Sequence, residues 1–284
     1  MKFGINTCLW TPAPTMAALP GLVRRARAAG ADWLELPLFA DTEDQSPVDA
    51  GALLRDHDMA VSVVTGLWPS EALASEDRAA GERGVASLRT VIERAAALGS
   101  RLLSGAFHTS GDKLRWHSPT ERAERIDRMS ERLSRLAAFA APYGITLCIE
   151  PLNRYEADLL NTTAQALDVV KSIDHPNCSL LLDTFHMNIE EASVGEALRA
   201  AGPWLRHLHA NESHRGAPGE GRIDWSEVAA ALRDVGYDGA LVIESFDAAD
   251  PEVAQGGHAW RPHAASADAL ASRGIAFLRQ AVVV

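Results

Sequence analysis

The chain has 284 residues, 47% of them hydrophobic, and a formal net charge of −11 at pH 7. This length and apolar content suit a single α/β barrel with a large core. The acidic balance argues against a nucleic-acid partner, because binding to a phosphate backbone requires clustered Lys and Arg. The sequence has no run of about 18 apolar residues, so we expect no transmembrane helix and no membrane partner.

Eight short β-rich runs alternate with helical segments along the chain. The predicted strands cover residues 2–9, 33–39, 60–67, 101–107, 145–152, 178–186, 205–212 and 240–247. Helices are predicted within residues 16–30, 87–100, 124–144 and 224–239, with αL stops at Gly30, Gly99, Gly144 and Gly236. Ser118 or Thr120 is the expected N-terminal cap of the helix near Pro119.

This alternation predicts a parallel α/β protein whose sheet is covered on both faces, because the strands are almost continuously apolar. The count of eight favours a closed (β/α)8 TIM barrel over an open, doubly wound sheet. No glycine-rich dinucleotide fingerprint or P-loop follows the first strand, which further weakens the open-sheet alternative. We find no linker, repeat or low-complexity tract, and therefore expect one barrel domain over residues 1–284.

The cellular location is predicted from the N-terminus and the cysteines. Residues 1–10 run directly into a strand-like pattern and lack the three-part layout of a signal peptide. Cys8, Cys148 and Cys178 all lie in apolar runs, which suggests reduced, buried thiols. We expect a cytoplasmic protein.

Four consecutive predicted strands carry a possible metal ligand at the carboxyl end: Glu150, Asp183, His209 and Glu244. In a barrel these ends meet at one mouth, where barrel enzymes keep their active sites. An oxygen-rich set with one imidazole suits Mn²⁺, Mg²⁺ or Co²⁺ better than a structural zinc ion. A divalent cation would also remove the repulsion among three carboxylates.

Each of these residues alone has a simpler interpretation. A strand-end acid is most often a helix cap or an ion-pair partner, and Asp183 could simply cap the segment that follows it. His207 and His209 lie on the same side of a strand, so one of them could serve only in packing. The occurrence of all four residues at equivalent strand ends favours the metal site.

Four stretches carry a family resemblance: "IEPLNRYEADLLNT", "LLLDTFHMNIEE", "HLHANESHRGAPGEGRIDW" and "VIESF". They resemble the ketose 3-epimerases (D-tagatose, D-allulose or psicose, and L-ribulose 3-epimerases) among the xylose-isomerase-like sugar isomerase/epimerase barrels. The resemblance covers nearly the whole chain and is strongest from Glu150 onward. It implies one divalent metal ion, Mn²⁺ first and Co²⁺ or Mg²⁺ as alternatives, bound by Glu150, Asp183, His209 and Glu244.

The resemblance also implies roles in catalysis and substrate binding. Glu150 and Glu244 would be the acid/base pair. The family positions that bind the substrate oxygens correspond to Glu156, His186 and Arg215. Phe246 matches an aromatic residue that packs against the sugar, and Trp10, Gly66 and Trp116 are further candidates. Residues 104–118 depart from the family pattern.

The implied reaction is inversion of C3 of a ketose through a cis-enediolate, with one carboxylate removing the proton and a second returning it on the opposite face. The small-molecule substrate is expected to be a free ketose, because no clustered phosphate cradle of Lys, Arg and Gly is evident. The relatives are commonly dimers or tetramers, so a homodimer or homotetramer is expected.

Three alternatives remain. An aldose–ketose or hydroxypyruvate-type isomerase would use the same barrel and metal site. An apurinic endonuclease could use His108, Glu150, Asp183 and His186, although residues 63–70 supply no histidine and residues 212–225 lack an Asp-x-His pair. A non-catalytic sugar-binding barrel would not need two opposed carboxylates and a metal ion.

Overall fold

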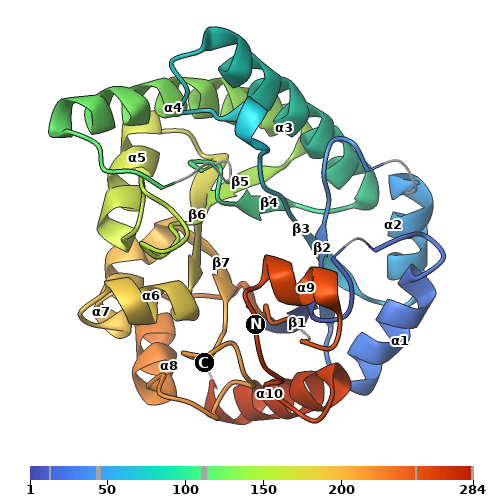
Figure 1. The fold of residues 1–284 in the computed structure, drawn as a ribbon. Helices are drawn as coiled ribbons and strands as arrows, with labels where there is room; N and C mark the ends of the chain where they lie inside the picture. The colour runs from blue at the N-terminus through green and yellow to red at the C-terminus, as the bar shows by residue number, and fades with distance from the viewer. Residues whose placement is uncertain (13, 43–45, 110–113, 247, 283–284) are drawn as a thin grey trace.

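The structure is a computed structural model that describes residues 1–12, 14–42, 46–109, 114–246 and 248–282. Eight parallel strands follow one another around a closed barrel, and the first strand pairs with the last (Figure 1). Helices form a ring outside the strands, as Figure 1 shows in a view into the barrel. The predicted (β/α)8 barrel is therefore confirmed.

The strands lie where the sequence predicts them. They are β1 (Lys2–Asn6), β2 (Trp33–Pro37), β3 (Ala60–Val64), β4 (Leu102–Gly105), β5 (Thr146–Ile149), β6 (Cys178–Asp183), β7 (Leu205–His209) and β8 (Ala240–Ile243). Each is shorter at its carboxyl end than predicted, because the chain there turns into loops around the mouth. Strand β6 ends at Asp183, whose side chain accepts a hydrogen bond from the Phe185 backbone N–H at 2.7 Å. The predicted end of the last strand, Asp247, lies outside the described residues.

The helices are α1 (Leu19–Ala28), α2 (Pro47–Asp56), α3 (Arg78–Leu98), α4 (Pro119–Ala140), α5 (Thr163–Ile173), α6 (Thr184–Glu190), α7 (Val194–Ala201), α8 (Trp225–Asp234), α9 (Pro251–Gly256) and α10 (Ala267–Ala281). Short 3-10 helices cover Thr7–Leu9, Pro69–Glu71, Ala141–Tyr143 and Gly202–Trp204. The four predicted stop glycines all have positive φ, from 64° to 93°. Ser118 is the cap of α4, accepting from the Glu121 backbone N–H at 3.2 Å.

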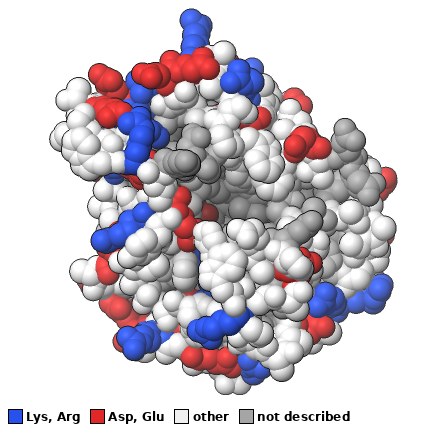
Figure 2. All heavy atoms as spheres, viewed as in Figure 1, with Lys and Arg blue, Asp and Glu red and all other residues white. Residues whose placement is uncertain are grey.

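The face that Figure 2 presents is hollowed near its centre, over the barrel. Acidic and basic side chains alternate around its periphery, so this face has no continuous basic stripe of the kind that nucleic-acid binding uses. None of the helices within the described ranges combines the length and the apolarity that a membrane-spanning segment requires.

Candidate active site

The four predicted ligand residues meet at the mouth of the barrel. Each offers a ligand atom, and these atoms all lie within 4.8 Å of one another. Measured from His209 Nδ1, Glu244 Oε2 lies at 3.4 Å, Glu150 Oε1 at 3.6 Å and Asp183 Oδ2 at 3.9 Å. Strand geometry explains the convergence, because neighbouring parallel strands end side by side.

This donor set fits a single divalent cation. Glu150 Oε1 and His209 Nδ1 are buried, and neither has a hydrogen-bond partner among the described residues. Unsatisfied polar atoms of this kind are costly in a protein interior, and a metal ion would satisfy both. Carboxylate oxygens with one imidazole are the donors that Mn²⁺, Mg²⁺ and Co²⁺ accept.

Glu150 and Glu244 have different proton affinities. Burial raises the pKa of Glu150 to about 7, with His209 opposing the shift and the charges of Glu244 and Asp183 adding to it. Burial would also raise the pKa of Glu244, but His209 and Arg215 outweigh it and hold that pKa below its usual value. The two carboxylates are therefore held in different electrostatic environments, as acid/base partners often are.

Arg215 contacts both the acidic side chains of the site and two aromatic rings. Its Nη1 lies 2.8 Å from Asp183 Oδ2 and 3.1 Å from Glu244 Oε2. Its guanidinium carbon lies 4.1 Å from the centre of the Phe185 ring and 5.5 Å from that of Phe246. The structure thus places the predicted residue Arg215 against two of the four candidate metal ligands, which we call the metal-ligand cluster, and the predicted residue Phe246 beside Arg215.

His186, in the first turn of α6, is buried and held by a residue that the sequence did not single out. Both the backbone N–H and the side-chain amide of Asn153 lie within hydrogen-bond distance of His186 Nδ1, at 3.3 and 2.9 Å. Burial and the charge of Arg215 hold the pKa of His186 well below its usual value, so the ring is neutral. The guanidinium Nη2 of Arg215 lies 3.3 Å from His186 Nε2. Nε2 lies 3.8 Å from Glu150 Oε1, and the Asn153 amide also donates to Glu156 Oε1 at 2.7 Å. Only the "N" in the quoted "EPLNRYE" motif could have indicated Asn153.

A second residue outside the predictions is Glu35 of β2, which is completely buried inside the barrel. Its carboxylate accepts from His209 Nε2 at 2.6 Å and from His207 Nε2 at 2.8 Å. His207 thus has a place in the barrel interior, as the sequence allowed. An acid within the apolar run "WLELPLF" was the only local signal for Glu35.

A cavity of about 170 Å³ adjoins the cluster and is lined by Glu156, Phe185, Arg215 and Phe246, with His258 and His263 among the remaining residues. The other aromatic and glycine candidates lie elsewhere. Gly66 lines a separate cavity of about 60 Å³, the Trp10 ring packs against Arg25, and Trp116 is 80% exposed.

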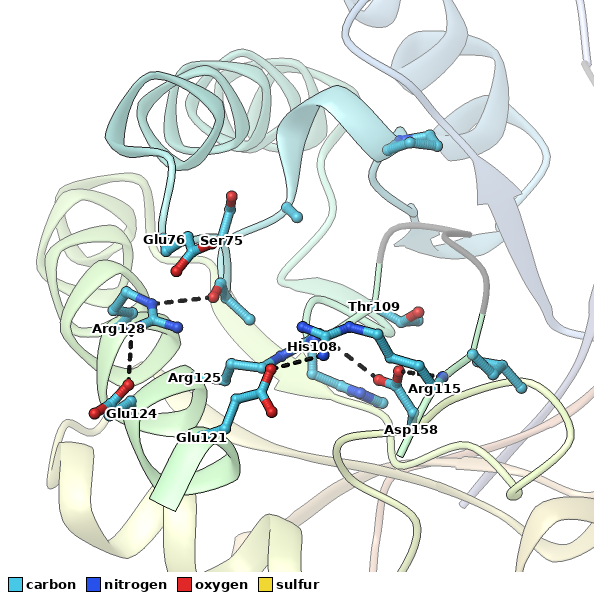
Figure 3. A pocket seen from close by; sticks show the side chains of 14 residues that line it. Ser75, Glu76, His108, Thr109, Arg115, Glu121, Glu124, Arg125, Arg128 and Asp158 are labelled. Atoms are coloured by element: carbon cyan, nitrogen blue, oxygen red, sulfur yellow. Dashed lines mark hydrogen bonds and ion pairs between the residues drawn. The ribbon is translucent and has the colours of Figure 1, made fainter. Parts of the chain in front are cut away.

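A larger cavity, of about 470 Å³, lies at the start of α4 (Figure 3). Its arginines face acids: Arg115 pairs with Glu121 at 2.7 Å, Arg125 with Asp158 at 3.7 Å and Arg128 with Glu124 at 4.0 Å. His108 lies at this cavity and donates through Nε2 to the Glu150 carbonyl at 2.8 Å. Among the described residues, the possible metal clusters do not include His108.

Comparison with known proteins agrees with this geometry. A family model described as "Xylose isomerase-like TIM barrel" matches residues 23–281. D-psicose 3-epimerase of Agrobacterium fabrum is 38% identical over 270 residues, covering 94% of this chain and 93% of that protein. L-ribulose 3-epimerase of Mesorhizobium japonicum is 34% identical over 282 residues, covering 98% of this chain and 93% of that protein.

Solved structures show the same relationship. A structure of L-ribulose 3-epimerase matches with a TM-score of 0.92 and 33% identity, covering 99% of this chain and 94% of that chain. D-psicose 3-epimerase with D-tagatose from Clostridium cellulolyticum H10 matches with a TM-score of 0.91 and 30% identity over 100% of both chains. The chain belongs to the xylose isomerase-like TIM barrel family. Within that family its resemblance to the ketose 3-epimerases is confirmed, and the protein is an isomerase-class enzyme.

Proposed function

We propose that this protein is a metal-dependent 3-epimerase of a free ketose, of the D-tagatose, D-allulose/D-fructose or L-ribulose type. The observation that carries the proposal is the pair Glu150 and Glu244, which approach one donor cluster from β5 and β8. The cation proposed is Mn²⁺, with Co²⁺ or Mg²⁺ as alternatives, bound by Glu150, Asp183, His209 and Glu244. The names of the relatives support the reaction.

The chemistry requires two bases because C3 changes configuration. The proton on C3 is weakly acidic, since the carbon adjoins a carbonyl group. When bound, a divalent cation supplies Lewis-acid stabilisation of the negative charge that develops on the substrate oxygens. One of Glu150 and Glu244 removes the proton from one face of the sugar, and the other returns a proton on the opposite face. Reversal exchanges their roles.

The neighbouring side chains orient the sugar. Arg215 and His186 are the side chains that hold the carbonyl-derived oxygen and an adjacent hydroxyl. Glu156, positioned by Asn153, accepts from a hydroxyl group. Phe246 and Phe185 form an apolar wall beside the guanidinium of Arg215.

A free ketose is favoured over a sugar phosphate. The three arginines at the larger cavity are each opposed by an acid, which reduces their attraction for a phosphate group. We also propose that the protein is cytoplasmic, which its three free cysteines support, two of them buried. A homodimer or homotetramer is part of the proposal, and the exposed rings of Trp116 and Tyr155 are available for contact between copies.

The decisive experiment is conversion in D₂O by chelated and then Mn²⁺-reconstituted protein, tested on a panel of ketopentoses and ketohexoses. We expect activity only with metal and solvent deuterium at C3 of the product, because the returning proton comes from a carboxyl group that exchanges with water. Deuterium at C1 would instead identify an aldose–ketose isomerase. Full activity of the metal-stripped protein would refute the metal dependence.

Two variants test the bases. Glu150→Gln and Glu244→Gln should each stop epimerisation, and their Mn²⁺ content must be measured because both residues are proposed ligands. Glu220→Gln is the matched control, since Glu220 forms an exposed ion pair with Arg273. A Glu150 or Glu244 variant with full metal content and a near wild-type rate would remove that residue from the mechanism.

A further inference from the structure

Glu35 is a carboxylate in an unusual place, the interior of the barrel below the metal-ligand cluster. It is completely buried, and its carboxylate lies within hydrogen-bond distance of five donors: Asn6 Nδ2 (3.0 Å), Ser62 Oγ (3.0 Å), Ser104 Oγ (3.3 Å), His207 Nε2 (2.8 Å) and His209 Nε2 (2.6 Å). The one hydroxyl hydrogen of Ser104 is shared with the Val63 carbonyl, at 3.1 Å. A buried carboxylate is stable only when its oxygens are satisfied in this way. The five donors come from four different strands, so the position of Glu35 is fixed from several sides.

The two carboxylate oxygens of Glu35 accept hydrogen bonds from different groups of donors. Oε1 accepts from Ser62, Ser104 and His207, all of which lie inside the barrel. Oε2 accepts from Asn6 and His209, which both reach the metal-ligand cluster. Asn6 Nδ2 lies 3.3 Å from Glu244 Oε1 as well. Glu35 therefore contacts one proposed ligand directly and a second one through Asn6.

The contact with His209 decides which ring nitrogen faces the cluster. Because Nε2 donates to Glu35, a neutral ring has its lone pair on Nδ1. Nδ1 is the atom that faces Glu150, Asp183 and Glu244, and it is buried without a hydrogen-bond partner among the described residues. A carboxylate behind a ligating histidine fixes the ring orientation and raises its basicity.

We infer that Glu35 is a positioning residue of the metal site: by holding Nε2 of His209 and the amide of Asn6, it presents Nδ1 of His209 and the carboxylate of Glu244 to one divalent cation. Glu35 does not reach the substrate and acts only through these two side chains. The inference rests on the proposed metal-dependent function and adds to it a residue from the opposite half of the chain.

A different interpretation would make Glu35, His207 and His209 a second metal site, because they too offer three clustered ligand atoms. The distances favour hydrogen bonds. At 2.6 and 2.8 Å, the contacts of Glu35 with the two rings have the length of charge-assisted N–H···O bonds. Ser62 and Asn6 also donate to the carboxylate, so each of its oxygens already accepts two hydrogen bonds and has no free lone pair for a cation.

The test is Mn²⁺ binding to the chelated full-length chain by titration calorimetry, compared for wild type, Glu35→Gln and Glu35→Asp. Gln turns one oxygen into a donor that opposes an imidazole N–H, so the tautomer or orientation of a histidine must change. We expect one Mn²⁺ per wild-type chain and an affinity about 10- to 100-fold lower in Glu35→Gln. Glu35→Asp keeps the charge, but its shorter side chain reaches less far towards His209. Its Mn²⁺ affinity should lie between those of the wild type and Glu35→Gln. The visible spectrum of the Co²⁺-loaded protein should change in both variants.

Glu212→Gln is the matched control, because Glu212 is equally buried and accepts from Trp225 Nε1 at 2.7 Å and from the Gly219 backbone N–H at 2.9 Å. It should lose stability but bind Mn²⁺ like the wild type. Near-equal Mn²⁺ affinity and an unchanged Co²⁺ spectrum in a folded Glu35→Gln or Glu35→Asp variant would overturn the inference, as would two ions per wild-type chain. A wild-type chain that binds no Mn²⁺ would instead refute the proposed function.

Discussion

At the scale of single residues, His108 shows how burial changes the chemistry of a side chain near the mouth. Burial lowers the pKa of its imidazole to about 4, against the opposing effect of its hydrogen bond to the Glu150 carbonyl. In the unfolded chain a histidine has a pKa of about 6.5. Between these two values the unfolded state binds a proton that the folded state does not, so stability falls as the pH falls through this window.

This difference predicts a pH-dependent contribution of His108 to stability. In chelated protein, His108 should lower the free energy of unfolding by on the order of 2 kcal/mol between pH 7 and pH 4.5, while the raised pKa of Glu150 acts in the opposite direction. His108→Gln keeps a donor for the Glu150 carbonyl but does not titrate, so the variant should be less destabilised by this change of pH than the wild type, by about that amount. Urea unfolding of both proteins at the two pH values measures the difference. Parallel changes would show that His108 is not responsible.

The residue scale also shows what the sequence could not provide. The four proposed ligands could be predicted because equivalent strand ends must converge in a barrel. Glu35 could not be assigned, because its partner His207 is 172 residues away and no local pattern links them. Asn153 likewise acts through His186, 33 residues further along the chain.

At the scale of elements, helix α3 depends on a glycine in its interior. A Cβ on Gly84 would lie 2.1 Å from the backbone oxygen of Glu71, so the 3-10 helix after β3 packs directly on the helix backbone. Gly21 of α1 is different, because the nearest atom to a Cβ placed there, Arg24 Nη2, would be 3.9 Å away. The same substitution should therefore have opposite effects in the two helices.

We predict that Gly84→Ala lowers the free energy of unfolding by about 1–3 kcal/mol through overpacking, although alanine favours helices. Gly21→Ala should be neutral or stabilise by up to about 1 kcal/mol. Urea midpoints of the two variants give the comparison. Equal effects would mean that the contact between α3 and the backbone at Glu71 can adjust to the new methyl group without loss of stability.

The elements themselves were largely predictable, and their ends were not. Apolar runs indicate strands because both faces of a parallel sheet are buried. Strand ends depend on tertiary contacts, as at Asp183, where a side chain begins α6 before the predicted strand over 178–186 is complete. Helix ends with a local signal lie close to the predicted places: Ser118, one of two predicted caps, begins α4, and Gly144 ends the 3-10 helix that follows it.

At the scale of the whole molecule, the site draws on every strand. Asn6, Glu35, Ser62 and Ser104 lie on β1 to β4, while Asp183 and His209 lie on β6 and β7. Glu150 and Glu244 directly follow β5 and β8. The metal-ligand cluster and the Glu35 hydrogen bonds can therefore exist together only in the closed barrel.

Metal binding should consequently stabilise the entire fold. A ligand that binds only the native state adds about 2.7 kcal/mol at 100 times its dissociation constant. Mn²⁺ should raise the thermal midpoint of chelated protein by several degrees, and Glu244→Gln should reduce the rise. Differential scanning calorimetry with and without Mn²⁺ measures it. An unchanged midpoint at saturating Mn²⁺ would contradict metal binding to the folded barrel.

The separation between Glu35 and His207 also has a consequence for biosynthesis. At about 5–20 residues per second, the ribosome needs roughly ten to thirty seconds to add the 172 residues between them. For that interval the nascent chain has the carboxylate of Glu35 but neither of its imidazole partners. Burying it early would leave a charge without its strongest donors, so the first strands are favoured to stay hydrated until β7 emerges. The full set of hydrogen bonds around Glu35 can therefore form only after β7 has been synthesised.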